Sequence, residues 1–350
     1  MRFSSSVTER RSDRRPLDLL RVAGSHREVG EQIGAHCADA IRRRCDALPP
    51  GAADAAAPYR AVTERELPWL VEELDAVADA AGADPMLLFA AGIEELDEQP
   101  APEPGRGCSD LVACGPATVD GHVWVAHTND LSASVEDELV AIEWRVPGDP
   151  VVFTVGIGPW ISVGFNGSGL SLTGNEVTPN DNRIGIPRLM QVRDMLRRRT
   201  LDEAVAAALH PARASSYNNV LAHRDGRVVS VEGSATDAEL LRPRDGRLAH
   251  TNHYVSERMR RYEGDGEYAA HSDVRYRRAL AWLAPGDITP STLRAALSDH
   301  TDAPDSICRH PHPGSETKTV FWCIADVTRG EITYGRGNPC DSDEQRYGFD

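Results

Sequence analysis

Apolar residues recur at helical spacing along the first hundred residues of the chain. Four of them lie four positions apart and fall on one face of a helix: Val29, Ile33, Cys37 and Ile41. We expect this helix to begin at the capping box Ser25-x-x-Glu28, where each side chain bonds the backbone N–H of the other residue. Pro49-Pro-Gly51 should end it, because proline and glycine interrupt helices.

Two further helices are predicted before residue 100. A second capping box, Thr63-x-x-Glu66, precedes the apolar residues Leu67, Leu70, Leu74 and Val77. A third helix should begin at Asp84-Pro85, where aspartate caps and proline occupies the first turn, and continue through residues 87–91. The pattern therefore predicts a helical N-terminal segment.

After Cys108 the pattern changes to short apolar runs separated by turn dipeptides such as Asp120-Gly121, Asn166-Gly167 and Asp225-Gly226. Strands are predicted at 108–114, 122–127, 140–144, 151–155, 161–165, 170–173, 219–223, 228–232, around 240 and 248, 320–325 and 331–334. Helices are predicted at 187–198, 201–209, 274–283 and 292–297. This order favours an α+β fold in which helices cover the outer faces of stacked antiparallel sheets.

Composition narrows the classes of function. The 350 residues are 41% apolar, enough for a large core, and 38 basic against 54 acidic residues give a net charge of −16. A surplus of negative charge argues against binding to nucleic acid or to an anionic membrane, and no apolar run is long enough to span a bilayer. Seven cysteines form no dense, even disulfide pattern, so we expect reduced thiols and a cytoplasmic protein.

One cysteine stands where a loop becomes a strand. The Pro-rich segment 99–107 has no periodicity, and Cys108 follows Gly107 directly. Cleavage between these two residues would give Cys108 a thiol beside an α-amine of pKa about 7.7–8, a nucleophile with its own base. Taken alone, a cysteine such as Cys108 is more often a buried structural thiol than a nucleophile, and its position after the loop is what favours the nucleophile. On pattern alone, the candidate oxyanion donors Asn175 and Asn252 are typical of turn residues.

Cysteine and histidine residues towards the C-terminus raise the possibility of a metal site. Cys308, His310, His312 and Cys323 are residue types that bind zinc. Pro311 and Pro313 interrupt the first three, however, and Cys323 lies inside a predicted strand. The sequence therefore predicts no metal site.

Six segments, in this order, resemble one known family. They are Gly107-Cys108, Ala126-His-Thr-Asn-Asp130, Gly164 to Asn175, Ser215 to Ala222, His250-Thr-Asn-His-Tyr254 and Gly335 to Cys340. Together they are similar to the autoproteolytic acyltransferase/hydrolase family typified by acyl-coenzyme A:6-aminopenicillanic acid acyltransferase, in the N-terminal-nucleophile (Ntn) hydrolase superfamily. The resemblance implies a four-layer αββα sandwich. It also implies self-cleavage that divides one integrated catalytic domain into an α chain, 1–107, and a β chain, 108–350.

The resemblance also assigns roles to individual residues. It makes Cys108 the nucleophile and base, gives Asp130 a hydrogen bond to the new α-amine, and lets Arg275 steady the nucleophile. Asn252 and Asn175 would form the oxyanion hole. The candidate substrate-binding residues are His127, Asn129 and His253. His127 departs from the pattern, because bile-salt and penicillin hydrolases of the superfamily have an arginine there, and a neutral histidine would not replace that charge.

The expected activity is cleavage or transfer at an amide or thioester bond of a small acylated amine or amino-acid conjugate, through a thioester acyl-enzyme. No cofactor is required. One alternative is an acyltransferase of secondary metabolism that uses a coenzyme A thioester as acyl donor, and another is an inactive or zinc-stabilised binding protein. The expected partners are the small-molecule substrate and the α and β chains of the same precursor, with neither nucleic acid nor membrane.

Overall fold

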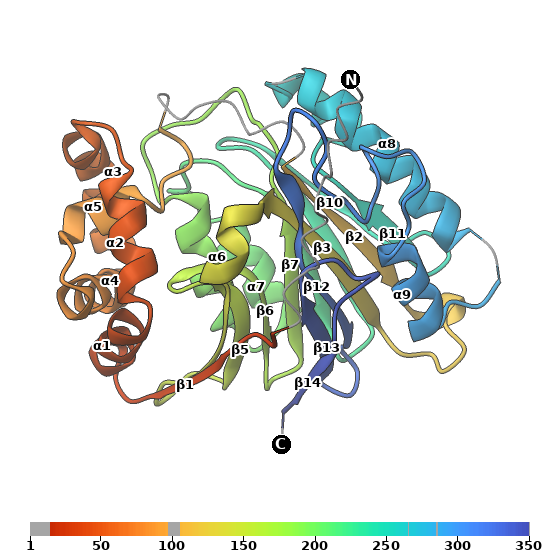
Figure 1. Cartoon of the computed structure of the whole chain (residues 1–350), viewed down its shortest axis with the longest axis horizontal. Coiled ribbons are helices and arrows are strands. Elements are labelled where there is room, and N and C mark those ends of the chain that lie inside the picture. Colours follow the sequence, from red (N-terminus) through yellow and green to blue (C-terminus); the bar gives the residue numbers. More distant parts are fainter. Residues whose placement is uncertain (1–14, 97–105, 265, 285, 350) are drawn as a thin grey trace, which may run out of the picture.

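Two β-sheets form the centre of the computed structural model, which describes residues 15–96, 106–264, 266–284 and 286–349 (Figure 1). The first sheet has the order β1-β4-β5-β6-β7-β8-β9-β10, and every neighbouring pair is antiparallel except β1 with β4. Its strands are Leu19–Ala23, Val140–Arg145, Val152–Ile157, Trp160–Asn166, Leu170–Asn175, Asn218–His223, Val228–Gly233 and Ala238–Leu241.

The second sheet is antiparallel throughout, with the order β11-β2-β3-β12-β13-β14. Its strands, in that order, are Arg247–His250, Gly107–Ala113, Trp124–Ser132, Thr317–Asp326, Glu331–Arg336 and Gln345–Gly348. Helices α6 (Arg188–Leu196) and α7 (Leu201–Ala208) pack on the first sheet, and α8 (Gly266–Leu283) and α9 (Pro290–Leu297) pack on the second. The layers are therefore αββα, as the sequence predicted.

Five further helices lie at one side of this sandwich, at the left of Figure 1. They are α1 (His26–His36), α2 (Ala38–Asp46), α3 (Ala52–Glu66), α4 (Pro68–Ala81) and α5 (Pro85–Ala90). Helix α1 packs closely on α4, because a Cβ added to Gly34 would come within 2.2 Å of the Val77 carbonyl oxygen. The predicted helical N-terminal segment is thus present, joined to the first sheet by β1.

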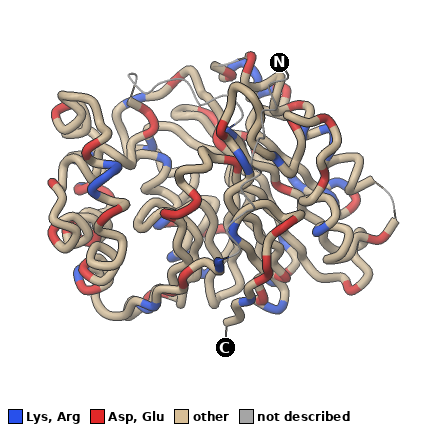
Figure 2. The backbone as a smooth tube through the Cα atoms, in the orientation of Figure 1, with Lys and Arg blue, Asp and Glu red and all other residues tan. Residues whose placement is uncertain are grey.

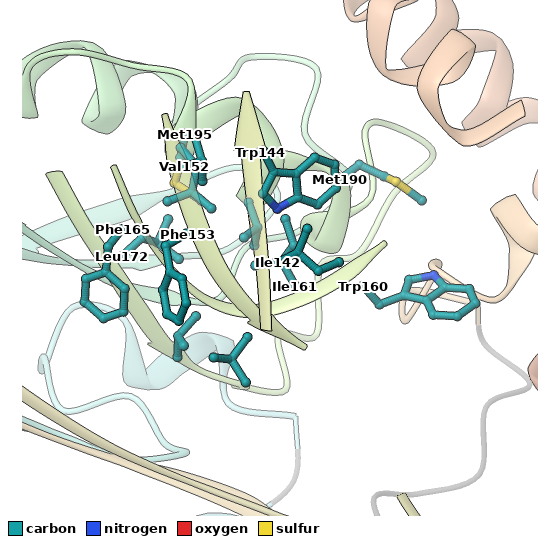
Figure 3. Close-up of a cluster of buried hydrophobic side chains, with 14 of the residues drawn as sticks. Ile142, Trp144, Val152, Phe153, Trp160, Ile161, Phe165, Leu172, Met190 and Met195 are labelled. Atoms are coloured by element: carbon teal, nitrogen blue, oxygen red, sulfur yellow. The ribbon is translucent and has the colours of Figure 1, made fainter. Parts of the chain in front are cut away.

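The core has an apolar part and a polar part. Figure 3 shows Trp144, Phe153 and Phe165 of the first sheet, with Met190 and Met195 of α6. Towards β7 the buried side chains become polar. Ser171, Thr173 and Asn175 alternate along the strand with residues that face α6. Asn175 lies within hydrogen-bond distance of His250 of β11 in the second sheet. Polar side chains therefore fill the space between the two sheets beside β2.

Several element boundaries differ from the predictions. The first predicted helix is two helices, because Cys37 leaves helical geometry (φ −98°, ψ 13°) between α1 and α2. The capping box at Thr63 was wrong: alanine-rich residues 52–61 already form α3, and the Thr63 hydroxyl donates to the Tyr59 carbonyl 2.9 Å away. Helix α4 begins instead at Pro68, since the residue before a proline disfavours helix.

The other local predictions had mixed outcomes. Asp84 caps α5 as predicted, accepting from the N–H groups of Met86 and Leu87. Asp120-Gly121 does not form a tight hairpin, because the connection from β2 to β3 also holds a 3₁₀ helix, η1 (Gly115–Ala117). The predicted Pro-rich loop lies outside the described residues, apart from its last two positions.

Charge is distributed over the whole molecule. Figure 2 shows acidic and basic residues interspersed along the backbone, without a continuous basic face. Within the described residues, no helix is long and apolar enough to cross a membrane.

Candidate active site

The pairing of β2 with β3 places the predicted residues next to one another. Gly107 lies opposite Asp130, Cys108 opposite Asn129, and Asp110 opposite His127. Because side chains alternate along a strand, Cys108, Asp110, His127 and Asn129 share the face directed at the first sheet. Asp130 lies on the other face, which carries α8 and α9.

The backbone of Cys108 is held by two side chains from distant segments. The Cys108 N–H donates to Asn252 Oδ1 at 2.7 Å, and Arg275 Nη1 donates to the Cys108 carbonyl at 2.5 Å. Arg275 Nη2 also donates to Asn252 Oδ1 at 2.9 Å. The structure therefore brings Cys108, Asn252 and Arg275 together, as expected from the sequence.

The orientation of Asn252 differs from its expected role. Two donors converge on its amide oxygen, while Nδ2 donates to the Glu176 carbonyl at 2.9 Å. In this arrangement Asn252 accepts a hydrogen bond from Cys108 and directs no free N–H at it. A role in positioning the cysteine fits this geometry better than a role in the oxyanion hole.

Asn175 has the free donor that Asn252 lacks. Its Oδ1 accepts from Asn218 Nδ2 at 3.0 Å and lies 3.0 Å from His250 Nδ1. Its Nδ2 is buried and, among the described residues, has no hydrogen-bond partner. A buried, unsatisfied N–H is costly unless it meets an acceptor, so Asn175 Nδ2 remains a donor available to a further acceptor.

A buried carboxylate that the sequence analysis missed holds the Asn252 loop. Glu232 Oε1 lies 2.6 Å from His250 Nε2, and the carboxylate accepts from the N–H groups of Val255 and Ser256. Glu232 and His250 are both fully buried. Glu232 follows a strand-like run without any local motif, so only the pairing of sheets reveals its role.

The surroundings of His127 bear on the charge beside Cys108. Its Nδ1 lies 3.0 Å from Asp110 Oδ1, and both side chains are fully buried. Burial alone would lower the pKa of His127, but the Asp110 carboxylate outweighs it and, with the nearby Cys108 thiol, raises that pKa to about 10. The raised pKa favours the protonated ring, which places positive charge beside Cys108.

Asp130 lies in a second buried charged group. It accepts from the Thr319 hydroxyl at 2.7 Å, and its Oδ2 is 3.8 Å from Arg309 Nε. Burial raises the pKa of Asp130, although Arg309 and Arg275 oppose that shift. With the chain uncut, the Cys108 N–H bonds Asn252, so the predicted contact between Asp130 and an α-amine requires cleavage first.

Cys108 opens onto a cavity of about 390 Å³, a volume typical of small-molecule sites. Apolar residues from several elements line it, including Val135, Trp160, Leu172 and Leu189, and so do Arg44 and Arg106. Of the three candidate substrate-binding residues, only Asn129 lines this cavity.

The other two candidates lie elsewhere. His127 is buried beneath Cys108, and His253 packs edge-on against Tyr276 and lies 2.9 Å from the Ser272 hydroxyl. Burial lowers the pKa of His253 to about 4, so its ring is neutral. The geometry does not support contact of either histidine with a substrate in this cavity.

A network of four charged residues anchors the chain just before Gly107. Arg106 pairs with Glu94 at 3.0 Å and with Glu176 at 3.3 Å, and Arg188 pairs with the same two carboxylates at 3.0 and 3.1 Å. The guanidinium of Arg188 also lies 4.3 Å from the centre of the Tyr217 ring. This network fixes one side of the Gly107–Cys108 peptide.

A sequence model of the acyl-coenzyme A:6-aminopenicillanic acid acyl-transferase (AAT) family matches residues 117–341. The chain belongs to this family. The match begins nine residues after Cys108, so the nucleophile position itself lies outside it. Membership makes the AAT-family chain an enzyme of the acyltransferase type, in agreement with the resemblance seen in its motifs.

Solved structures with similar folds were also found. A variant of conjugated bile acid hydrolase from Clostridium perfringens is 12% identical, with a TM-score of 0.38, and the match covers 69% of this chain and 97% of that one. Penicillin V acylase from Agrobacterium tumefaciens is 13% identical, with a TM-score of 0.39, covering 65% and 83%. No curated protein sequence matches the chain.

Proposed function

We propose that this protein is a self-processing amidohydrolase or acyltransferase in which Cys108 becomes the N-terminal nucleophile. The observation that carries the proposal is the pair of side chains that bind the Cys108 backbone. Asn252 and Arg275 bind the N–H and carbonyl of a half-buried cysteine that faces a cavity. A purely structural thiol needs neither an arginine on its carbonyl nor an opening to solvent.

Maturation begins with attack of the Cys108 thiol on the Gly107 carbonyl carbon. A C–S bond forms, the Gly107–Cys108 C–N bond breaks, and the thiol proton passes to the departing nitrogen. Water then hydrolyses the thioester, leaving a carboxylate on Gly107 and a free thiol and α-amine on Cys108. These two groups are the nucleophile and base that turnover requires.

In turnover the α-amine takes the thiol proton and the thiolate attacks an acyl carbonyl. Protonated His127 favours the thiolate through its charge, and the free Nδ2 of Asn175 stabilises the oxyanion. Collapse expels an amine that receives the proton, leaving a thioester on Cys108. Water completes hydrolysis, whereas a second amine completes acyl transfer.

The cavity favours a small acylated amino acid as substrate. Its apolar lining suits the acyl chain, and Arg44 offers a positive charge for a carboxylate. The second candidate function, transfer from a coenzyme A thioester, is favoured by membership of an acyltransferase family. A cavity of about 390 Å³ would hold only the acyl end of such a donor.

Intact mass and N-terminal sequencing of freshly purified protein test the proposal. We expect wild-type protein to give a chain that begins at Cys108, while Cys108→Ala stays near the full 38.1 kDa and has no amidase activity. Cys114→Ser, which alters a buried thiol of the same segment, should still be cut. Uncut wild-type protein with full activity would refute the proposal.

A further inference from the structure

A second cluster of chemically reactive side chains lies away from Cys108. Four ligand atoms lie within 4.8 Å of one another, contributed by His300, Cys308, His310 and Cys340. Cys308 is fully buried, whereas the other three residues are exposed at one edge of the cluster. We propose that these four residues bind one structural Zn²⁺ ion.

The distances match the edges of a coordination tetrahedron. With Zn–S bonds of about 2.3 Å and Zn–N bonds of about 2.0–2.1 Å, tetrahedral geometry separates two sulfurs by about 3.8 Å, sulfur and nitrogen by about 3.6 Å, and two nitrogens by about 3.3 Å. The two sulfurs lie 3.6 Å apart, and His310 Nε2 lies 3.8 and 3.4 Å from them. His300 Nε2 and His310 Nε2 are 3.1 Å apart.

The ligand types select the metal and its role. Two thiolates with two imidazoles suit zinc, whereas magnesium and calcium prefer oxygen ligands. Four protein ligands fill a tetrahedral shell and leave no open position for a substrate or an activated water. The proposed ion is therefore structural.

Neighbouring groups support the ligands. Asn338 Nδ2 lies 3.6 Å from Cys308 Sγ and donates to the Arg309 carbonyl at 2.6 Å. The Ser306 hydroxyl donates to the Cys308 carbonyl at 2.7 Å. Such contacts orient metal ligands, and Asn338 and Ser306 are both buried.

The ion would join two separate segments. His300, Cys308 and His310 lie in the connection between α9 and β12, and Cys340 follows β13. The residues between α9 and β12 form no helix or strand, so few regular backbone hydrogen bonds hold this stretch. A metal that cross-links such a stretch contributes its binding free energy to folding.

The site also surrounds a residue that contacts the candidate active site. Arg309 lies between two of the ligands, its N–H donates to the Thr319 hydroxyl at 2.9 Å, and its Nε is 3.8 Å from Asp130. Zinc would thus make Arg309 a positioning residue for Asp130. The zinc proposal does not depend on self-cleavage, because metal content is measured without reference to activity.

Two of the four residues whose types suggested zinc in the sequence, Cys308 and His310, belong to this cluster. Cys323 is fully buried within β12, and His312 Nδ1 lies 3.1 Å from the Pro313 carbonyl, so neither belongs to the cluster. His300 and Cys340 take their places, at separations of 8 and 32 residues from Cys308 that match no common zinc motif.

Metal analysis of the full-length protein tests the site. The protein is reduced, dialysed against Zn²⁺ and then dialysed against metal-free buffer. We expect one zinc per wild-type chain, and loss of that zinc in Cys340→Ser and in His300→Ala. Both variants alter exposed side chains and should fold, as circular dichroism will check. His312→Ala, in the same loop, and Cys114→Ser, which removes another thiol, should each retain one zinc.

Two further measurements test the coordination geometry of the site and its contribution to thermal stability. Co²⁺ in place of zinc should give the visible ligand-field bands of a tetrahedral thiolate site in wild-type protein and not in Cys340→Ser. Chelation should lower the melting temperature of wild-type protein, and added zinc should restore it. A wild-type chain that binds no more zinc than Cys340→Ser, or that contains a Cys308–Cys340 disulfide instead, would overturn the proposal.

Discussion

At the scale of single residues, crowding around Gly107 explains why glycine precedes the nucleophile. Gly107 lies in extended backbone, so an unusual φ angle does not require glycine there. A Cβ at this position would instead lie 2.5 Å from Arg275 Nη2 and 2.7 Å from Asn252 Oδ1, closer than these atoms can approach. Glycine therefore lets Asn252 and Arg275 reach the N–H and carbonyl of Cys108.

Gly107→Ala should displace these two side chains and slow self-cleavage by about 10²-fold, the typical cost of a 1 Å misplacement of catalytic groups. The measurement is the fraction of cut chain against time after synthesis. Gly348→Ala, where an added Cβ meets nothing within 4 Å, is the matched control. Equal cleavage rates for the two variants would show that the crowding is unimportant.

The ion pair of His127 with Asp110 predicts a pH dependence of stability. The folded-state pKa of His127, about 10, exceeds the ordinary value of about 6.5. The stabilisation is therefore complete below about pH 6.5 and is lost as the pH rises towards 10. Denaturant titrations from pH 6 to 10 should show falling stability in wild-type protein and a flatter profile in His127→Gln. Parallel profiles would mean that His127 is neutral.

The sequence predicted some residues of the site better than others. Cys108, Asn252 and Arg275 come together as their motifs implied, since each motif carries its residue to a strand end or helix face. The charge on His127 could not be predicted, because it depends on Asp110 lying opposite in the β2–β3 register. That register follows from the length of the connection, which the Asp120-Gly121 turn signal alone does not give.

At the scale of elements, α2 brings a positive charge to the cavity. Arg44 lines the cavity, and its Nε, 3.5 Å from Glu138 Oε2, makes no hydrogen bond within the described residues. Arg43, on the same helix, donates to Glu138 at 3.0 Å and does not line the cavity. Arg43 and Arg44 thus share the single carboxylate of Glu138, so the group keeps one net positive charge at the cavity for an anionic group of the substrate.

Arg44→Met should raise KM for acylated amino acids by roughly 10-fold or more, the loss of about 1.5–3 kcal/mol for a hydrogen bond to a charged group. Uncharged amides with the same acyl chain should be hydrolysed as before. Arg43→Met is the matched control and should leave both substrates unaffected. An equal loss for charged and uncharged substrates would exclude recognition of a carboxylate by Arg44.

The boundaries of helices and strands show which features a local sequence pattern does not predict. The capping-box rule succeeded at Ser25 and failed at Thr63, although both fit the same pattern. At Thr63 the preceding alanine-rich turns already favoured helix, so the threonine lies in a helix interior. Strand β1 carried no signal of its own, because it is five residues long and is stabilised by parallel pairing with the distant β4.

At the scale of the whole molecule, the segment before the proposed cleavage site is built into the sandwich. Strand β1 pairs with β4 over residues 19–23. The buried carboxylate of Glu73 in α4 accepts two hydrogen bonds from Arg193 of α6, at 3.1 and 3.2 Å. Glu95 accepts from the Arg188 N–H and from the Ser215 hydroxyl, both at 2.7 Å. Each contact crosses between the two proposed chains.

The α and β chains should therefore remain associated after cleavage between Gly107 and Cys108. Apolar burial and these buried polar contacts are unaffected by cutting one peptide bond at the edge of the cavity, and no contact named above involves the cut itself. On gel filtration, mature protein should elute as one species at the volume of uncut Cys108→Ala, and it should separate into two chains only in denaturant. Glu73→Gln, which keeps the shape of the side chain but weakens its bond to Arg193, should make the chains dissociate at lower denaturant than wild type. Free α chain in native buffer would show that the N-terminal helices form a separable pro-segment.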